Sequence, residues 1–152
     1  MIQHADHMAR CLELARIAVE AGNGPFGSVM VSGGRLITES YNQVSTNQDL
    51  TAHAEMRAIR EACRALDTVE LTGCTLYASA EPCFMCSYAI RIARVSQVVI
   101  GARAVDRGGV SSKYPILSDP DIAGWEAPPH IVREVLLDQC TSLLHEYGFY
   151  SI

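Results

Sequence analysis

The chain has 152 residues, of which 49% are hydrophobic, and its formal net charge is -5. This length suits one domain with a well-buried core, and no apolar run approaches the roughly 18 residues of a transmembrane helix. The twelve lysine and arginine residues are dispersed, which disfavours a protein that grips a nucleic-acid backbone. We therefore expect a single soluble domain, residues 1–152.

The first third of the chain predicts a helix and a hairpin. Apolar residues recur at helical spacing over residues 5–21, and the helix should stop at Gly22. Two strands, 26–31 and 36–41, flank Ser32-Gly33-Gly34-Arg35. Glycines there supply the positive φ that a tight hairpin turn needs.

Helices and strands then alternate. Residues 52–66 predict a helix capped by Thr51, residues 75–79 a short strand, and residues 83–93 a helix preceded by Pro82. Residues 97–101 predict the next strand. After Arg103, prolines interrupt the pattern, and we expect loops with one short helix, then a strand over 131–135 and a helix over 136–147. This order predicts an open α/β sheet with helices on both faces, a three-layer α/β/α fold.

The most informative motif is His53-Ala54-Glu55 followed by Pro82-Cys83-Phe84-Met85-Cys86. A Cys-x-x-Cys alone is equally typical of a redox pair, half of a structural zinc site or two core cysteines. His53, Cys83 and Cys86 together make three zinc ligands. Because structural zinc sites are normally closed by four ligands, three ligands indicate an open, catalytic site.

Glu55 lies two residues after His53, so it can stand beside the metal without binding it and act as a proton carrier. The predicted helices place all of these residues near helix N-termini. That position stabilises negative charge and lowers the pKa of a thiol.

These motifs make the chain resemble the cytidine deaminase-like superfamily, in the branch with guanine deaminases, fungal cytosine deaminases and tRNA adenosine deaminases. The first half looks most like guanine deaminases, and the stretch 98–103 looks equally like tRNA adenosine deaminases. The resemblance rests on residues 24–27, 42–46, 49–55, 81–83 and 98–103.

The resemblance implies a mixed sheet of about five strands, a Zn²⁺ cofactor and an aminohydrolase that releases ammonia from an amino-heterocycle. The acidic charge favours a free nucleobase, guanine first and then cytosine or an analogue. The alternative is a tRNA wobble-adenosine deaminase that makes inosine. A catalytically silent zinc-binding subunit is the third possibility, against which the intact Glu55 argues.

The resemblance also implies substrate contacts for six residues. Asn42 would read the edge of the base, and Phe26 would stack on it. The backbone N-H of Ala54 and the carbonyl of Glu81 would contact the base and its amine. Asp106 would lie near the base, and Tyr150, with its neighbouring aromatics, would close over it. A turn asparagine, a core phenylalanine and a solvated carboxylate remain alternatives for Asn42, Phe26 and Asp106.

The N-terminal residues and the cysteines suggest the cellular compartment. The first six residues have neither a cationic nor an apolar signal region, so we expect a cytoplasmic protein with reduced thiols. The four cysteines outside the motif are expected in the core. Family resemblance further implies a homodimer.

Overall fold

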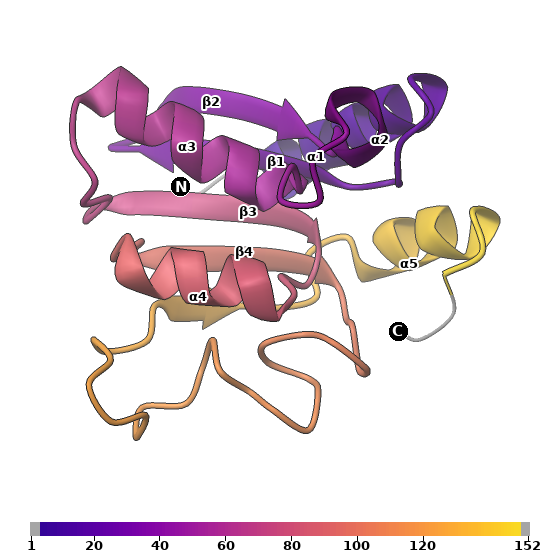
Figure 1. The fold of residues 1–152 in the computed structure, drawn as a ribbon. Helices are drawn as coiled ribbons and strands as arrows, with labels where there is room; N and C mark the ends of the chain where they lie inside the picture. The colour runs from indigo at the N-terminus through magenta and orange to yellow at the C-terminus, as the bar shows by residue number, and fades with distance from the viewer. Residues whose placement is uncertain (1–3, 150–152) are drawn as a thin grey trace.

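The computed structural model describes residues 4–149, which form a mixed five-stranded sheet flanked by helices (Figure 1). The strand order is β2-β1-β3-β4-β5; β1 pairs antiparallel with β2 and β3, whereas the β3-β4 and β4-β5 pairs are parallel. The strands are β1 (Gly27–Ser32), β2 (Arg35–Tyr41), β3 (Cys74–Ala80), β4 (Gln97–Ala102) and β5 (His130–Val132). The helices are α1 (His4–Glu20), α2 (Val44–Asn47), α3 (Ala54–Leu66), α4 (Phe84–Ile92) and α5 (Leu137–Glu146).

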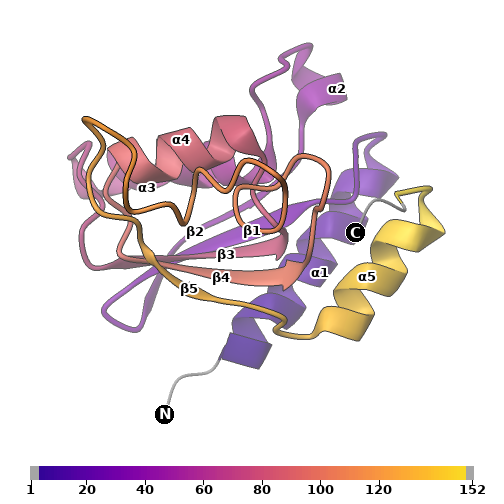
Figure 2. The same cartoon turned by 90° about the horizontal axis from the view of Figure 1, so that it is seen from below.

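Helices cover both faces of the sheet, which confirms the predicted three-layer fold. Figure 2 shows α3 and α4 on one face and α1 and α5 on the other. Each face has its own apolar core. Met30 and Val98 belong to the core under α3 and α4, whereas their neighbours Val29 and Val99 belong to the core under α1 and α5. Successive side chains of a strand point to opposite faces, so strands buried on both sides are continuously apolar.

The predicted β1-β2 hairpin is confirmed. Gly33 and Gly34 turn the chain with φ angles of 57° and 77°. Residues with a Cβ rarely adopt such positive φ angles. Within residues 4–149, no helix is both long and apolar enough to cross a membrane.

The predicted cap at Thr51 is wrong. Its hydroxyl and its backbone N-H both donate to Asp49 Oδ1, at 2.7 and 2.9 Å, so this threonine closes a turn instead. Helix α3 begins later, with His53 in the N-cap position. Helix α2 was not predicted. Backbone N-H groups at its start donate to Asn23 Oδ1, a contact between segments that no local pattern reveals.

The short helix predicted after Arg103 is also wrong, because the segment between β4 and β5, all of it described, contains no helix. Proline residues interrupt this segment, and the buried guanidinium of Arg91 holds it instead. Arg91 donates to the carbonyl oxygens of Ile116 (3.0 Å), Asp119 (2.7 Å) and Glu126. These bonds satisfy carbonyls that a helix would have paired internally.

Strand β5 ends at Val132, earlier than predicted. Glu134 and Leu136 have φ angles of 64° and 53°, and this left-handed backbone cannot continue a strand. Helix α5 follows directly.

Candidate active site

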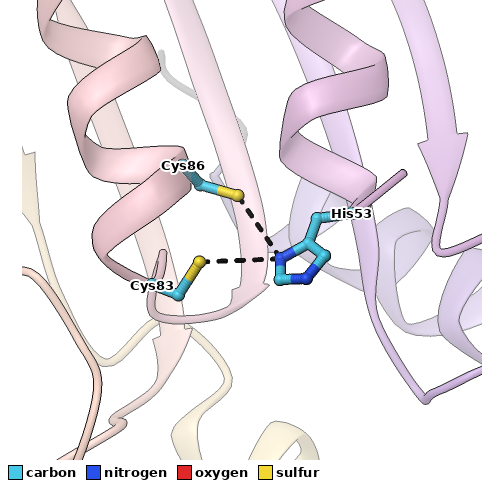
Figure 3. Close-up of side chains that lie close together, drawn as sticks. All are labelled: His53, Cys83 and Cys86. Atoms are coloured by element: carbon cyan, nitrogen blue, oxygen red, sulfur yellow. Dashed lines mark hydrogen bonds between the residues drawn. The ribbon is translucent and has the colours of Figure 1, made fainter. Parts of the chain in front are cut away.

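Helices α3 and α4 bring three metal-binding side chains together at their N-termini (Figure 3). His53 is the N-cap residue of α3, and Cys83 is the N-cap residue of α4; both have an extended backbone. Cys86 lies in the first turn of α4. The side chains therefore point toward one another from two helices that are far apart in the sequence.

The distances between these atoms match a zinc site. His53 Nδ1 lies 3.5 Å from Cys83 Sγ and 3.6 Å from Cys86 Sγ, and the three ligand atoms lie within 4.8 Å of one another. Tetrahedral zinc, with Zn-S of about 2.3 Å and Zn-N of about 2.0 Å, places a nitrogen and a sulfur ligand about 3.5 Å apart. The residues therefore fit zinc. Three ligands leave the fourth position open, as catalytic zinc sites require.

Electrostatics act in opposite directions on the two thiols. A hydrogen bond from Cys86 lowers the pKa of Cys83 to about 4, and the same bond raises the pKa of Cys86. A hydrogen bond to Cys83 raises the pKa of His53. These shifts keep the proton on Cys86, and a metal ion that binds both sulfurs would displace it.

Glu55 lies in the first turn of α3 and is 7% exposed. Burial raises the pKa of its carboxyl group to about 7, and the negative charge of Cys83 acts in the same direction. A carboxyl group with this pKa can both accept and release a proton near neutral pH. This is the property that a proton carrier needs.

A cavity of about 230 Å³ lies beside these groups. It brings together three of the predicted substrate-binding residues with Glu55 and with His53 and Cys83 of the metal-binding cluster. Its walls are formed by Phe26, Asn42, His53, Glu55, Ala80, Glu81, Cys83, Arg103, Ala104, Arg107, Leu144 and Phe149.

Three other predicted substrate contacts are not among the described residues that line the cavity. Ala54 is buried as the first residue of α3, where its N-H has no partner within the helix. Asp106 is exposed, and its carboxylate lies 3.1 Å from the guanidinium of Arg107. Asp106 therefore lies at the surface beside Arg107. Tyr150 lies outside the described residues.

Two arginines in the cavity wall were not predicted. Arg103 follows the end of β4, and Arg107 lies in the loop beyond it. Phe149, proposed from the sequence only as part of a closing aromatic tail, packs edge-on against Phe26 with ring centroids 5.3 Å apart. Two sequence features pointed to Arg103. It lies at the end of an apolar strand, where parallel sheets present functional residues, and it belongs to the stretch 98–103 that resembles tRNA adenosine deaminases.

Asn42 is 7% exposed and is held by its own chain. Its Oδ1 accepts a hydrogen bond from the N-H of Val44 at 3.1 Å, which fixes the plane of the side-chain amide. A fixed amide in the cavity wall can present a donor to a heterocycle at constant geometry.

The side chain of Glu81 fastens the loop after β4 to the site. Its carboxylate, on a residue only 4% exposed, accepts bonds from the N-H groups of Val110 (3.0 Å) and Ser111 (2.8 Å), and from the Ser111 hydroxyl (2.6 Å). Gly108 forms a β-bridge with Cys83. The loop is therefore tied directly to a metal-binding residue.

Gly108→Ala is expected to destabilise the protein. The added Cβ would lie 1.7 Å from Glu81 Oε2 and 2.5 Å from the carbonyl oxygen of Ala104. Such overpacking costs about 1–3 kcal/mol, which in a chain of this size lowers Tm by about 2–4 °C per kcal/mol. Thermal unfolding of zinc-loaded protein measures the change. Gly24→Ala is the control, because its Cβ meets only the side chain of Phe26; an equal Tm for both variants would contradict the prediction.

Comparisons with known proteins agree with this geometry. Residues 1–102 match the family model for the cytidine and deoxycytidylate deaminase zinc-binding region. The tRNA-specific adenosine deaminase of Aquifex aeolicus is 41% identical over 139 residues, 90% of this chain and 87% of that protein. The guanine deaminase of Bacillus subtilis is 45% identical over 106 residues, 69% of this chain and 68% of that protein.

The fold comparison points the same way. A structure from studies of A-to-I editing by tRNA:A34 deaminases superposes with a TM-score of 0.85 at 35% identity. The superposition covers 91% of this chain and 99% of that one. With the family model, the relatives and the converging metal ligands in agreement, the chain belongs to the cytidine and deoxycytidylate deaminase family and is a zinc-dependent hydrolytic deaminase.

Proposed function

We propose that this deaminase converts adenosine to inosine in RNA, as tRNA-specific adenosine deaminases do, and that residues 1–152 form one catalytic domain. The extent of the similarity carries this proposal. The match to the Aquifex tRNA enzyme spans 90% of the chain, whereas the match to the Bacillus guanine deaminase spans 69%. The similarity to this tRNA enzyme therefore extends over more of the chain than the similarity to that guanine deaminase.

Zinc, when bound by His53, Cys83 and Cys86, lowers the pKa of water and so supplies a nucleophile at neutral pH. Glu55 accepts a proton from the attacking water and passes it to the ring nitrogen beside the amino-bearing carbon. It then carries a second proton to the amino group, which leaves as ammonia while the carbon becomes a carbonyl. Glu55 is 7% exposed and faces the cavity, where it can reach both the attacking water and the base.

The remaining wall of the cavity would hold the base. Asn42 presents its amide to the edge of the ring, and the aromatic ring of Phe26 covers a face of it. We also propose that the N-H of Ala54 and the carbonyl of Glu81 contact the base and the leaving amine.

Deamination of free guanine is the second candidate. The contact between Phe26 and Phe149 favours it, because a C-terminal aromatic residue in the cavity wall could enclose a small base. The net charge of -5 also favours a substrate without a polyanionic backbone.

Ammonia release separates the two candidates. Zinc-loaded protein is incubated with a tRNA anticodon stem-loop containing a wobble adenosine, with free guanine and with free cytosine, and Glu55→Ala is the blank. We expect Glu55-dependent release from the stem-loop and inosine in the product RNA. Release from guanine alone would overturn the proposal in favour of the second candidate.

We further propose that the enzyme is a cytoplasmic homodimer. Sedimentation of the zinc-loaded protein measures its mass directly, and a mass equal to one chain of 16.5 kDa would overturn the dimer.

A further inference from the structure

Two cations stand at the opening of the cavity. Arg103 and Arg107 both line it, yet their side chains are 46% and 40% exposed, so each guanidinium reaches from the cavity wall into solvent. The reacting base is uncharged at neutral pH, so it cannot neutralise the charge of either arginine. We therefore expect the positive charges of Arg103 and Arg107 to pair with an anionic group of the substrate outside the ring of the base.

Their partners within the chain are weak. Arg103 pairs with Glu134 at 2.7 Å and Arg107 with Asp106 at 3.1 Å, and both carboxylates are about half exposed. Exposed pairs of this kind contribute little, because water competes with them. A phosphate could replace either carboxylate and accept two parallel bonds from one guanidinium.

The loop that carries these arginines is held against the site. The buried carboxylate of Glu81 accepts bonds from the N-H groups of Val110 and Ser111, and the N-H of Gly109 donates to the carbonyl of Pro82 at 3.0 Å. Arg107 also lies over the ring of Phe149, with its Cζ 5.8 Å from the ring centroid. The guanidinium groups thus have a defined position relative to the cavity, which reduces the cost of binding an anion.

We propose that Arg103 and Arg107 form a phosphate subsite, which holds a backbone phosphate next to the nucleotide whose base enters the cavity. This inference rests on the proposed function, since it assumes a substrate that carries phosphate. It also explains how an acidic chain can bind RNA: the cations are few but stand at the place where the substrate enters.

Single neutral linkages in the RNA test the subsite. Stem-loops are prepared with a methylphosphonate in place of the phosphate on the 5′ or the 3′ side of the reactive adenosine. With wild-type enzyme, one of the two substitutions is expected to lower kcat/KM about tenfold. Arg107→Gln and Arg103→Gln should lower kcat/KM for the native RNA by a similar factor, and the methylphosphonate should have little further effect on them.

Arg16→Gln is the matched control. Arg16 is similarly exposed and pairs with the exposed Glu146 at 3.7 Å, but it lies on α1 and does not line the cavity. It should behave as wild type with every RNA. The subsite is overturned when Arg107→Gln and Arg103→Gln match Arg16→Gln, or when their effects multiply with that of the neutral linkage.

Deamination of guanine but of no RNA would refute the proposed function, and the phosphate subsite could still be tested on that substrate. If the enzyme deaminates guanine and no RNA, inhibition of guanine turnover by guanosine and by guanosine 5′-monophosphate is compared. Stronger inhibition by the monophosphate that disappears in Arg107→Gln supports a phosphate subsite on a different substrate. Equal inhibition by the two compounds overturns it.

Discussion

Glu55→Gln is expected to retain zinc and to lower kcat by about three orders of magnitude. General acid-base catalysis by one side chain contributes about 10²–10⁴-fold, and Glu55 performs two proton transfers in the proposed reaction. Glutamine has nearly the same shape but cannot accept and release a proton. Because this side chain is buried, the amide of the glutamine should occupy the position of the carboxyl group. The fold and the three metal-binding residues should therefore be undisturbed.

Atomic absorption measures the zinc content of the variant. Ammonia release at saturating substrate measures its kcat. Glu61→Gln is the control, because Glu61 lies on the same helix but pairs with Arg57 at 2.9 Å, outside the cavity wall. Glu61→Gln should retain activity. Activity near that of wild type in zinc-loaded Glu55→Gln would exclude Glu55 as the proton carrier.

The metal cluster could be predicted from sequence because each part depends on local order. Pro82 precedes Cys83, the spacing to Cys86 is one helical turn, and His53 precedes the alanine-rich helix α3. Two helix N-termini directed at one ion follow from this arrangement. The hairpin and the layer order were likewise predictable, since they depend on glycine positions and on runs of apolar residues.

Features that depend on contacts between distant segments could not be predicted. The loop after β4 takes its shape from Arg91 and from the carboxylate of Glu81, whose partners lie 25 to 35 residues away. The sequence suggested only the backbone carbonyl of Glu81 as functional, whereas its side chain holds that loop. Residues on such a loop cannot be assigned to a cavity until the loop is placed.

The predicted preference for guanine is not confirmed, and it also depended on features that the sequence alone cannot place in space. It relied on the aromatic C-terminus, on the likeness of the first half to guanine deaminases and on the net charge of -5, which is a sum over the whole chain. Binding depends on where charges stand, and Arg103 and Arg107 place two positive charges at the cavity. The relatives quoted above include both a tRNA-specific adenosine deaminase and a guanine deaminase, so the net charge alone does not identify the substrate.

Cys86→Ala is expected to lower zinc affinity more than about 100-fold and to abolish detectable deamination. Even loss of a residue that merely supports a metal ligand costs about 10–100-fold in affinity or activity. Cys86 is fully buried and its Sγ lies 3.6 Å from His53 Nδ1 within the cluster, and the methyl group of alanine cannot coordinate a metal ion. Two remaining ligands cannot hold zinc in the tetrahedral geometry that the reaction requires.

Cys140→Ala separates loss of a ligand from loss of packing. Cys140 is also buried, at 1% exposure, but it lies in the core under α1 and α5, away from the metal-binding cluster. Added zinc should raise the Tm of wild type and Cys140→Ala, because a ligand that binds only the folded state stabilises it. It should leave the Tm of Cys86→Ala nearly unchanged. One equivalent of tightly bound zinc in Cys86→Ala would remove Cys86 from the ligand set.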